Sequence, residues 1–214
     1  MTKPPTRPLS RSLARAVSLT INPLILPPLL VAVVLAEAGA DVSETLRISG
    51  GLAILLTLFP LGFLGWMARL GQSDSVVVLS RRQRLRPYLF GLACAVLALI
   101  FVSKAADTSA GAVFSITLCF VANTVLLMSV NYRWKISIHA AAAAGFLAVL
   151  FTLSIVSTGA IPPHLYLLVP AVPLVMWARV HSGAHSAGEV LAGATLGLVA
   201  VPAELISLHF LGLW

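Results

Sequence analysis

Four residues that could do chemistry fall within eleven positions of an otherwise apolar chain. The stretch "RVHSGAHSAGE", residues 179 to 189, contains Arg179, His181, His185 and Glu189. Asp, Glu, Lys and Arg together make up only 10% of the 214 residues, and the stretch lies between two segments apolar enough to cross a bilayer. Ionisable groups at membrane depth are costly, so by default they mark a functional site.

The spacing of His185 and Glu189 favours nucleophilic chemistry. Residues four apart share one face of a helix, so a helix that begins slightly before His185 would let the carboxylate hold the imidazole in one tautomer. The helix dipole would disfavour the imidazolium form, and attack on phosphorus requires a neutral, oriented imidazole. Two alternatives stay open. Ser186-x-x-Glu189 fits a capping box, and His181, His185 and Glu189 have helical metal-ligand spacing, although Gly183 interrupts it.

A second polar cluster is "RWKISIHA", residues 133 to 140, just ahead of an alanine-rich apolar segment. Lys135, the Ser137 hydroxyl and the free N–H groups of a helix start could together bind an anion, with His139 as the proton donor. The simpler interpretation makes Lys135 an interfacial anchor, Ser137 a helix cap and His139 a histidine with ordinary hydrogen bonds.

A third cluster is "SDSVVVLSRRQRLRP", residues 73 to 87, with four arginines in six positions. Planar guanidinium groups match phosphate oxygens, so this loop is a candidate phosphate cradle. A cytoplasmic loop of a membrane protein is also rich in arginine, which is the alternative interpretation.

The elements that must position these clusters are membrane helices. Apolar residues make up 59% of the chain, far above the ~45–50% of soluble domains. We therefore predict an all-α fold, a polytopic transmembrane helix bundle with six to seven membrane spans, formed by a single domain over residues 1–214 with a basic N-terminal segment, 1–17. The candidate spans are 20–38, 48–68, 88–104, 111–130, 139–158, 163–178 and 187–212.

The first candidate span is irregular because of prolines at 23, 27 and 28. Basic residues ahead of it and "AGA" at 38–40 also fit a signal peptide with a cleavage site. Because six more spans follow, we interpret it as an uncleaved anchor.

The distribution of basic residues predicts the orientation in the membrane. Only Arg47 and Lys104 lie in loops on the far side, so the amino terminus and the polar clusters should face the cytoplasm. The other twelve of the fourteen lie on the amino-terminal side: Lys3, Arg7, Arg11, Arg15, Arg69, Arg81, Arg82, Arg84, Arg86, Arg133, Lys135 and Arg179.

The net charge of +7 does not indicate a nucleic-acid partner, because the cations sit in short loops without interleaved aromatic residues. Anionic lipid head groups or a phosphorylated substrate are the expected partners. Cys94 and Cys119 fall inside apolar segments and are interpreted as packing residues.

The number of spans between the clusters predicts that they meet. Two spans separate the first cluster from the second, and two more separate the second from the third, so all three return to one membrane face. Two histidines, an orienting carboxylate and several cations together are suited to phosphoryl transfer through a phosphohistidine, without a metal or other cofactor.

These residues resemble motifs of the type 2 phosphatidic acid phosphatase superfamily, whose third motif is Ser-Arg-x5-His-x3-Asp. Here Ala178-Arg179, His185 and Glu189 keep that spacing, with Ala for Ser and Glu for Asp. A divergent prokaryotic branch matches better, through "WKISIHA" and through the residues Ser73, Asp74, Arg81, Arg84 and Pro87. The resemblance covers about residues 70 to 200.

The resemblance implies a role for each matching residue. His185 would be the nucleophile, Glu189 its orienting carboxylate and His139 the acid that protonates the leaving oxygen. Phosphoryl oxygens would be held by Arg81, Arg84, Lys135, Ser137 and Arg179.

The resemblance also implies a substrate class and a location. We expect a lipid phosphatase of the prokaryotic plasma membrane, acting on an isoprenoid phosphate or diphosphate. Phosphatidic acid and phosphatidylglycerophosphate are alternative substrates. A non-catalytic bundle that binds or transports a lipid phosphate is the alternative from a different class.

Overall fold

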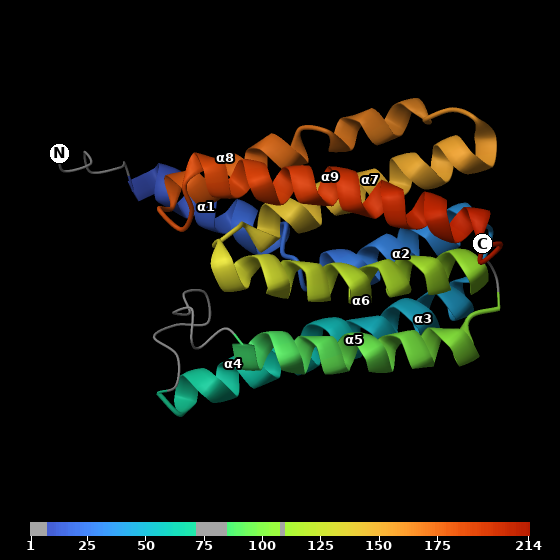
Figure 1. The fold of residues 1–214 in the computed structure, drawn as a ribbon, viewed down its shortest axis with the longest axis horizontal. Coiled ribbons are helices and arrows are strands. Elements are labelled where there is room, and N and C mark those ends of the chain that lie inside the picture. The colour runs from blue at the N-terminus through green and yellow to red at the C-terminus, as the bar shows by residue number, and fades with distance from the viewer. Residues whose placement is uncertain (1–7, 72–84, 108–109) are drawn as a thin grey trace.

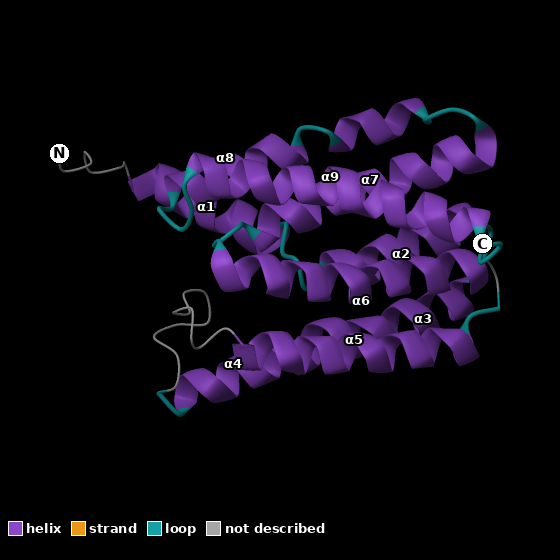
Figure 2. Cartoon of the chain, viewed as in Figure 1, coloured by secondary structure: helices purple, strands orange, loops and turns teal. Residues whose placement is uncertain are grey.

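The computed structural model describes residues 8–71, 85–107 and 110–214, and the regular structure in those ranges is helical throughout, without a strand (Figure 2). Six helical segments are long and apolar enough to cross a membrane: 42–69, 85–105, 110–133, 138–158, 163–181 and 187–210. The predicted all-α, membrane-spanning architecture is confirmed.

The long helices lie side by side and form a bundle (Figure 1). In chain order they are α1 (Pro8–Thr20), α2 (Leu26–Glu37), α3 (Val42–Ala53), the π-helical turn η1 (Ile54–Leu58), α4 (Phe59–Arg69), α5 (Leu85–Ala105), α6 (Ala110–Arg133), α7 (Ile138–Thr158), the 3-10 helix η3 (Pro163–Leu168), α8 (Ala171–His181) and α9 (Ala187–Phe210). The segment α3–η1–α4 is continuous and forms one candidate crossing.

The first predicted span, 20–38, differs from the structure. The helix is interrupted over residues 21–25, where the Asn22 side chain accepts a hydrogen bond from the Leu24 N–H at 2.9 Å. Pro27 and Pro28 lie in the first turn of α2, where a missing N–H removes no helical hydrogen bond. The basic segment 1–17 is helical from Pro8 onward, and α1 and α2 run in the same direction along the bundle (Figure 1).

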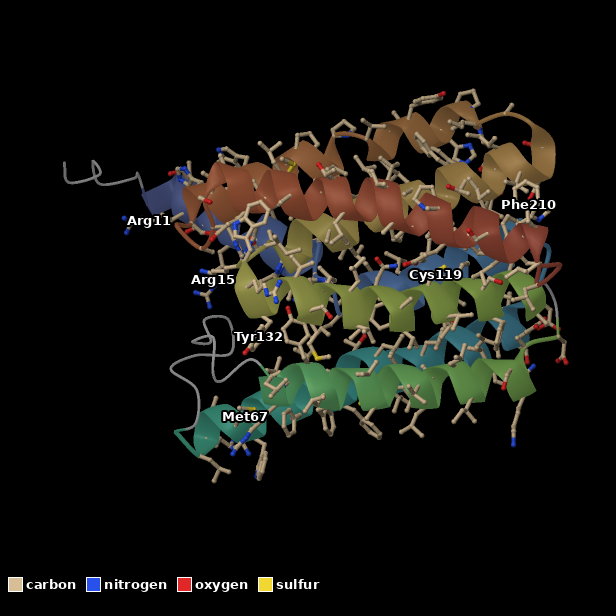
Figure 3. The ribbon with its side chains drawn as sticks, viewed as in Figure 1. Arg11, Arg15, Met67, Cys119, Tyr132 and Phe210 are labelled. Carbon is tan, nitrogen blue, oxygen red and sulfur yellow. The ribbon has the colours of Figure 1, made fainter. Side chains whose placement is uncertain are left out.

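The connections that carry two of the polar clusters, and the helix ends that flank the third, lie at one end of the bundle. The chain passes from α6 to α7 and from α8 to α9 at the end where α1 begins, and α4 ends and α5 begins there too (Figure 1). Arg11, Arg15, Met67 and Tyr132 mark this end, whereas Phe210 lies at the opposite end (Figure 3). This end is called the site end below.

Two glycines let α9 lie directly on α7. A Cβ on Gly193 would meet the backbone carbonyl oxygen of Ser137, and a Cβ on Gly197 would meet the carbonyl oxygen of Ala141 and lie 2.8 Å from the Gly145 nitrogen. Small residues at helix interfaces allow this close approach in membranes. The start of α7 is thereby held against the first turns of α9, which fixes the second polar cluster, residues 133–140, relative to the first, residues 179–189.

We predict that Gly193→Ala destabilises the protein and Gly188→Ala does not. In Gly193→Ala the new methyl group collides with backbone rather than with a mobile side chain, so α7 and α9 must separate, at a cost of about 1–3 kcal/mol. Gly188 lies in the same helix with nothing within 4 Å of its Cβ position, and alanine favours a helix over glycine. Unfolding midpoints of the two variants in detergent test this. Equal midpoints would contradict the close contact.

Candidate active site

The turn between α8 and α9 is shaped by Gly183, whose φ is +72°. The Gly183 N–H donates to the Val180 carbonyl at 3.0 Å, and the Ala184 N–H donates to the Arg179 carbonyl at 3.1 Å. This Schellman arrangement needs a left-handed residue, which glycine adopts without strain. Helix α8 therefore ends at His181, and His181 and His185 do not share a helix as the metal-ligand interpretation requires.

His185 and Glu189 form a hydrogen-bonded pair at the start of α9. The Nδ1 atom of His185 lies 3.1 Å from Oε2 of Glu189, with side chains only 10% and 19% exposed. The same Oε2 accepts the Ser186 N–H at 3.0 Å, and the Ser186 hydroxyl accepts the Glu189 N–H at 3.3 Å. The capping box and the carboxylate–imidazole pair thus coexist. His185 precedes the helix, so the earlier helix start considered from the sequence is not needed.

The second polar cluster contacts this pair directly. The Ser137 N–H donates to the Glu189 carbonyl at 3.0 Å, and Nζ of Lys135 donates to the Ala184 carbonyl at 2.9 Å. Ser137 is fully buried and caps α7, its hydroxyl accepting the Ala140 N–H at 3.3 Å. The structure therefore brings Lys135 and Ser137 together with His185 and Glu189, as the count of spans predicted.

Arg179 and His139 complete the inner part of the site. Arg179 lies in the last turn of α8 and is only 5% exposed, and its Nε atom has no hydrogen-bond partner among the described residues. Its positive charge acts on both His139 and His185. A buried guanidinium is costly unless a partner satisfies it, and the oxygens of a phosphate would do so.

Helix α1 is the part of the site that sequence reasoning missed. Nε2 of His181 lies 3.0 Å from the hydroxyl of Ser10 in this helix. His181 also stacks on Trp177, with ring centroids 5.1 Å apart. His181 is thus engaged by α1 and α8, whereas His185 pairs with Glu189. The available signal was the spacing of the small residues Ser10, Ala14 and Ser18, which repeats every four positions.

The remaining predicted ligands lie outside the described residues. These are Arg81 and Arg84, together with Ser73 and Asp74 of the same loop, so the predicted phosphate cradle has no described geometry. Arg86 and Pro87 lie in the first turn of α5. Within 8–71, 85–107 and 110–214, no group of three or more His, Cys, Asp or Glu residues is placed to hold a metal ion. Cys94 and Cys119 are free and buried.

The surroundings of His185 favour the neutral imidazole. Burial lowers the pKa of His185 below its ordinary value, and the positive charges of Arg179 and Lys135 lower it further. The hydrogen bond to Glu189 and the charge of that carboxylate oppose the shift without cancelling it. His185 is therefore uncharged at neutral pH, with Nδ1 engaged by Glu189 and Nε2 as the nitrogen that remains for attack.

We predict opposite pH shifts from two substitutions beside His185. Lys135→Gln removes a charge that lowers the His185 pKa, so the acidic limb of kcat/KM moves to higher pH. Glu189→Gln removes a carboxylate that raises that pKa, so the limb moves to lower pH. The substrate's own ionisation is the same in both variants, so the difference between the two pH profiles reports the change in the pKa of His185. Shifts in the same direction would contradict the assignment.

Comparisons of the chain with protein-family models, with curated proteins and with solved structures give no match. Any function inferred for this protein therefore depends on its residues, their geometry and the resemblance of their motifs.

Proposed function

We propose that this protein is an integral membrane phosphatase that removes phosphate from a lipid phosphate or diphosphate through a phosphohistidine at His185, with no metal in the reaction. The observation that carries the proposal is the His185–Glu189 pair, joined at 3.1 Å, beside the buried Arg179 and next to Lys135. The carboxylate orients the nucleophile, and the two cations provide charge for phosphoryl oxygens.

The reaction has two steps. In the first, Nε2 of His185 attacks phosphorus, the N–P bond forms and the P–O bond to the lipid breaks, while the leaving oxygen takes a proton from His139. In the second, His139 takes a proton from water as the water oxygen attacks phosphorus and the N–P bond breaks. Phosphate is released and both histidines return to their starting forms.

The site's position at the end of a membrane bundle supports the proposed substrate class. A lipid tail can stay among the apolar helices while only the head group enters the cationic site. We propose an isoprenoid phosphate or diphosphate, because the motifs resemble the divergent prokaryotic branch most closely. Phosphatidic acid and phosphatidylglycerophosphate are the alternative substrates.

Phosphate release by purified protein in EDTA tests the proposal. The panel contains polyprenyl phosphate, polyprenyl diphosphate, phosphatidic acid and phosphatidylglycerophosphate. Release that persists in EDTA supports a metal-free phosphatase and ranks the substrates. Binding of these lipids without release from any of them would contradict the enzyme and favour a lipid-phosphate binding or transport protein.

We also propose that the site end faces the cytoplasm, because the basic loops gather there. Arg133 lies at the site end of α6 and Lys104 at the far end of α5, and both are exposed. In intact cells, an impermeant thiol reagent should label Lys104→Cys and should label Arg133→Cys only after permeabilisation. Both native cysteines are buried, so background labelling is low. The reverse pattern would place the site on the outer face.

A further inference from the structure

Helix α1 has three faces of different chemistry. Residues four apart share one face of a helix, and side chains of three kinds repeat at that spacing along α1. The rows are Leu9 and Leu13, then Ser10, Ala14 and Ser18, then Arg11 and Arg15. The helix therefore has an apolar face, a face of small residues and a cationic face.

The face of small residues is the one that packs on the bundle. Ala14 and Ser18 are buried, and the Ser10 hydroxyl lies 3.0 Å from Nε2 of His181. The helix contacts α8, and small side chains let two helix backbones approach closely. The apolar and cationic faces, on either side of this contact, are therefore turned away from α8.

The other two faces are exposed. Leu9 and Leu13 are 82% and 55% exposed, and Arg11 and Arg15 are exposed as well. Figure 3 shows both arginines extending from α1 at the site end. Helix α1 thus presents an apolar face and a cationic face to its surroundings.

Helix α1 is an arm that is separate from α2. The helix is interrupted between them at residues 21–25. Helix α1 contacts α8, whereas α2 contacts α3, α6 and α7. The directions of the three faces of α1 are therefore set by its contact with α8 rather than by α2.

The contact with α8 also sets the level of α1 in the membrane. Ser10 meets His181, the last residue of the candidate crossing 163–181. Because α1 begins where α8 ends (Figure 1), α1 runs back along that crossing. At a rise of about 1.5 Å per residue, the backbones of Arg11 and Arg15 lie within about 8 Å of the end of the crossing. Long basic side chains at such positions extend to the membrane interface, where the lipid phosphates lie.

We propose that α1 is a lipid-binding arm, in which Arg11 and Arg15 bind the phosphate groups of anionic phospholipids while Leu9 and Leu13 lie against the acyl chains. Guanidinium groups form charge-assisted hydrogen bonds with phosphate, and basic residues at this level attract anionic lipids. A zwitterionic lipid carries its own cation, so its attraction to the arginines is weaker. The bound lipid is a phosphodiester and not the proposed substrate, so α1 can bind it whether or not the protein is a phosphatase.

A fluorophore on Ala16→Cys reports which lipid lies on the apolar face. Ala16 is exposed and lies two turns after Leu9 on that face, and both native cysteines are buried. The full-length protein is placed in phosphatidylcholine vesicles with a trace of nitroxide-labelled phosphatidylglycerol or, separately, of phosphatidylcholine with the same acyl-chain nitroxide. Each basic residue enriches anionic lipid locally by about fivefold, so at low salt phosphatidylglycerol should be preferred by roughly 25-fold, measured as quenching.

Three variants assign the preference to the two arginines. Arg11→Gln/Arg15→Gln should lower it by at least about tenfold, and Arg11→Lys/Arg15→Lys should retain most of it because the charge is kept. Arg133→Gln removes another exposed arginine of the site end, from α6, and should leave the preference unchanged. All of these side chains are exposed, so the variants should fold like the wild type.

Three results would overturn the lipid-binding arm. Equal quenching by the two labelled lipids would show that α1 does not select anionic lipid. A preference that survives Arg11→Gln/Arg15→Gln would place the binding of anionic lipid elsewhere. Quenching by both lipids that falls as the protein density in the vesicles rises would show that a second copy of the chain covers the apolar face. None of these measurements uses phosphate release, so they leave the proposed phosphatase untouched.

Discussion

Replacing His185 by glutamine is expected to lower phosphate release by at least about 10⁴-fold, because loss of a nucleophile leaves only binding and charge stabilisation. Glutamine approximates the imidazole in size and can still donate a hydrogen bond to Glu189, so the capping box and the turn at Gly183 should survive. Its amide cannot form the N–P bond of the intermediate. The ratio of the wild-type rate to the variant rate is measured as phosphate release from the best lipid substrate, in detergent micelles with EDTA present.

The matched control for His185→Gln is His164→Gln. His164 lies in η3 and its side chain is 60% exposed, 4.0 Å from the Glu37 carboxylate. It should be replaceable with no effect on release. A His185→Gln protein that retains release near the wild-type rate would show that phosphoryl transfer does not pass through this residue, and the nucleophile would then have to be sought elsewhere.

Replacing Arg179 by methionine is expected to lower kcat/KM by about 10²–10³-fold, the usual effect of removing one donor that stabilises charge in the transition state. Methionine has a similar length but no charge. Because Arg179 is only 5% exposed and its Nε has no partner among the described residues, the free protein bears a desolvation cost that methionine removes. The variant should therefore be as stable as the wild type, or more stable.

The combination of lost activity with retained stability is what distinguishes a functional arginine from a structural one. Arg133→Met is the control, because Arg133 is also at the site end but is exposed, and it should retain both properties. Unfolding midpoints measured together with kcat/KM show whether the role of Arg179 is functional or structural. If stability and activity of Arg179→Met fall together, Arg179 holds the bundle rather than the phosphate.

The sequence predicted the architecture well because the membrane imposes simple requirements. Length and hydropathy are enough to locate helices such as α7 and α9, since backbone groups in hydrocarbon must be satisfied within a helix. The bounds of the first predicted span, 20–38, were wrong, because hydropathy does not reveal that the helix is interrupted at Asn22. The π-helical turn Ile54–Leu58 inside the crossing 42–69 likewise has no clear sequence signature.

Within the site, local geometry was more predictable than contacts between distant segments. The pairing of His185 with Glu189 and the caps at Ser137 and Ser186 follow from short-range spacing. The hydrogen bond between Ser137 and Glu189 was not predictable as a contact. The count of spans predicted only that the two residues lie at the same membrane face. The contact of Ser10 with His181 could not be anticipated, because nothing in the sequence places α1 beside α8.

Another long-range contact shows the same limit inside the bundle. The Asn123 amide of α6 donates to the Glu204 carboxylate of α9 at 2.5 Å. Each is a polar residue in a largely apolar helix, and its sequence neighbours do not indicate which residue it pairs with. Only the packing of α6 against α9 joins them.

The most direct test of the central claim is to trap the phosphorylated enzyme. Protein incubated with radiolabelled phosphate ester is quenched within a turnover, and the label is located by peptide mapping and by its chemical stability. Phosphohistidine survives alkali and is lost in acid, so we expect alkali-stable label on the peptide containing His185 and none in His185→Gln. Label on another residue, or phosphate released with no labelled protein at any quench time, would contradict the mechanism.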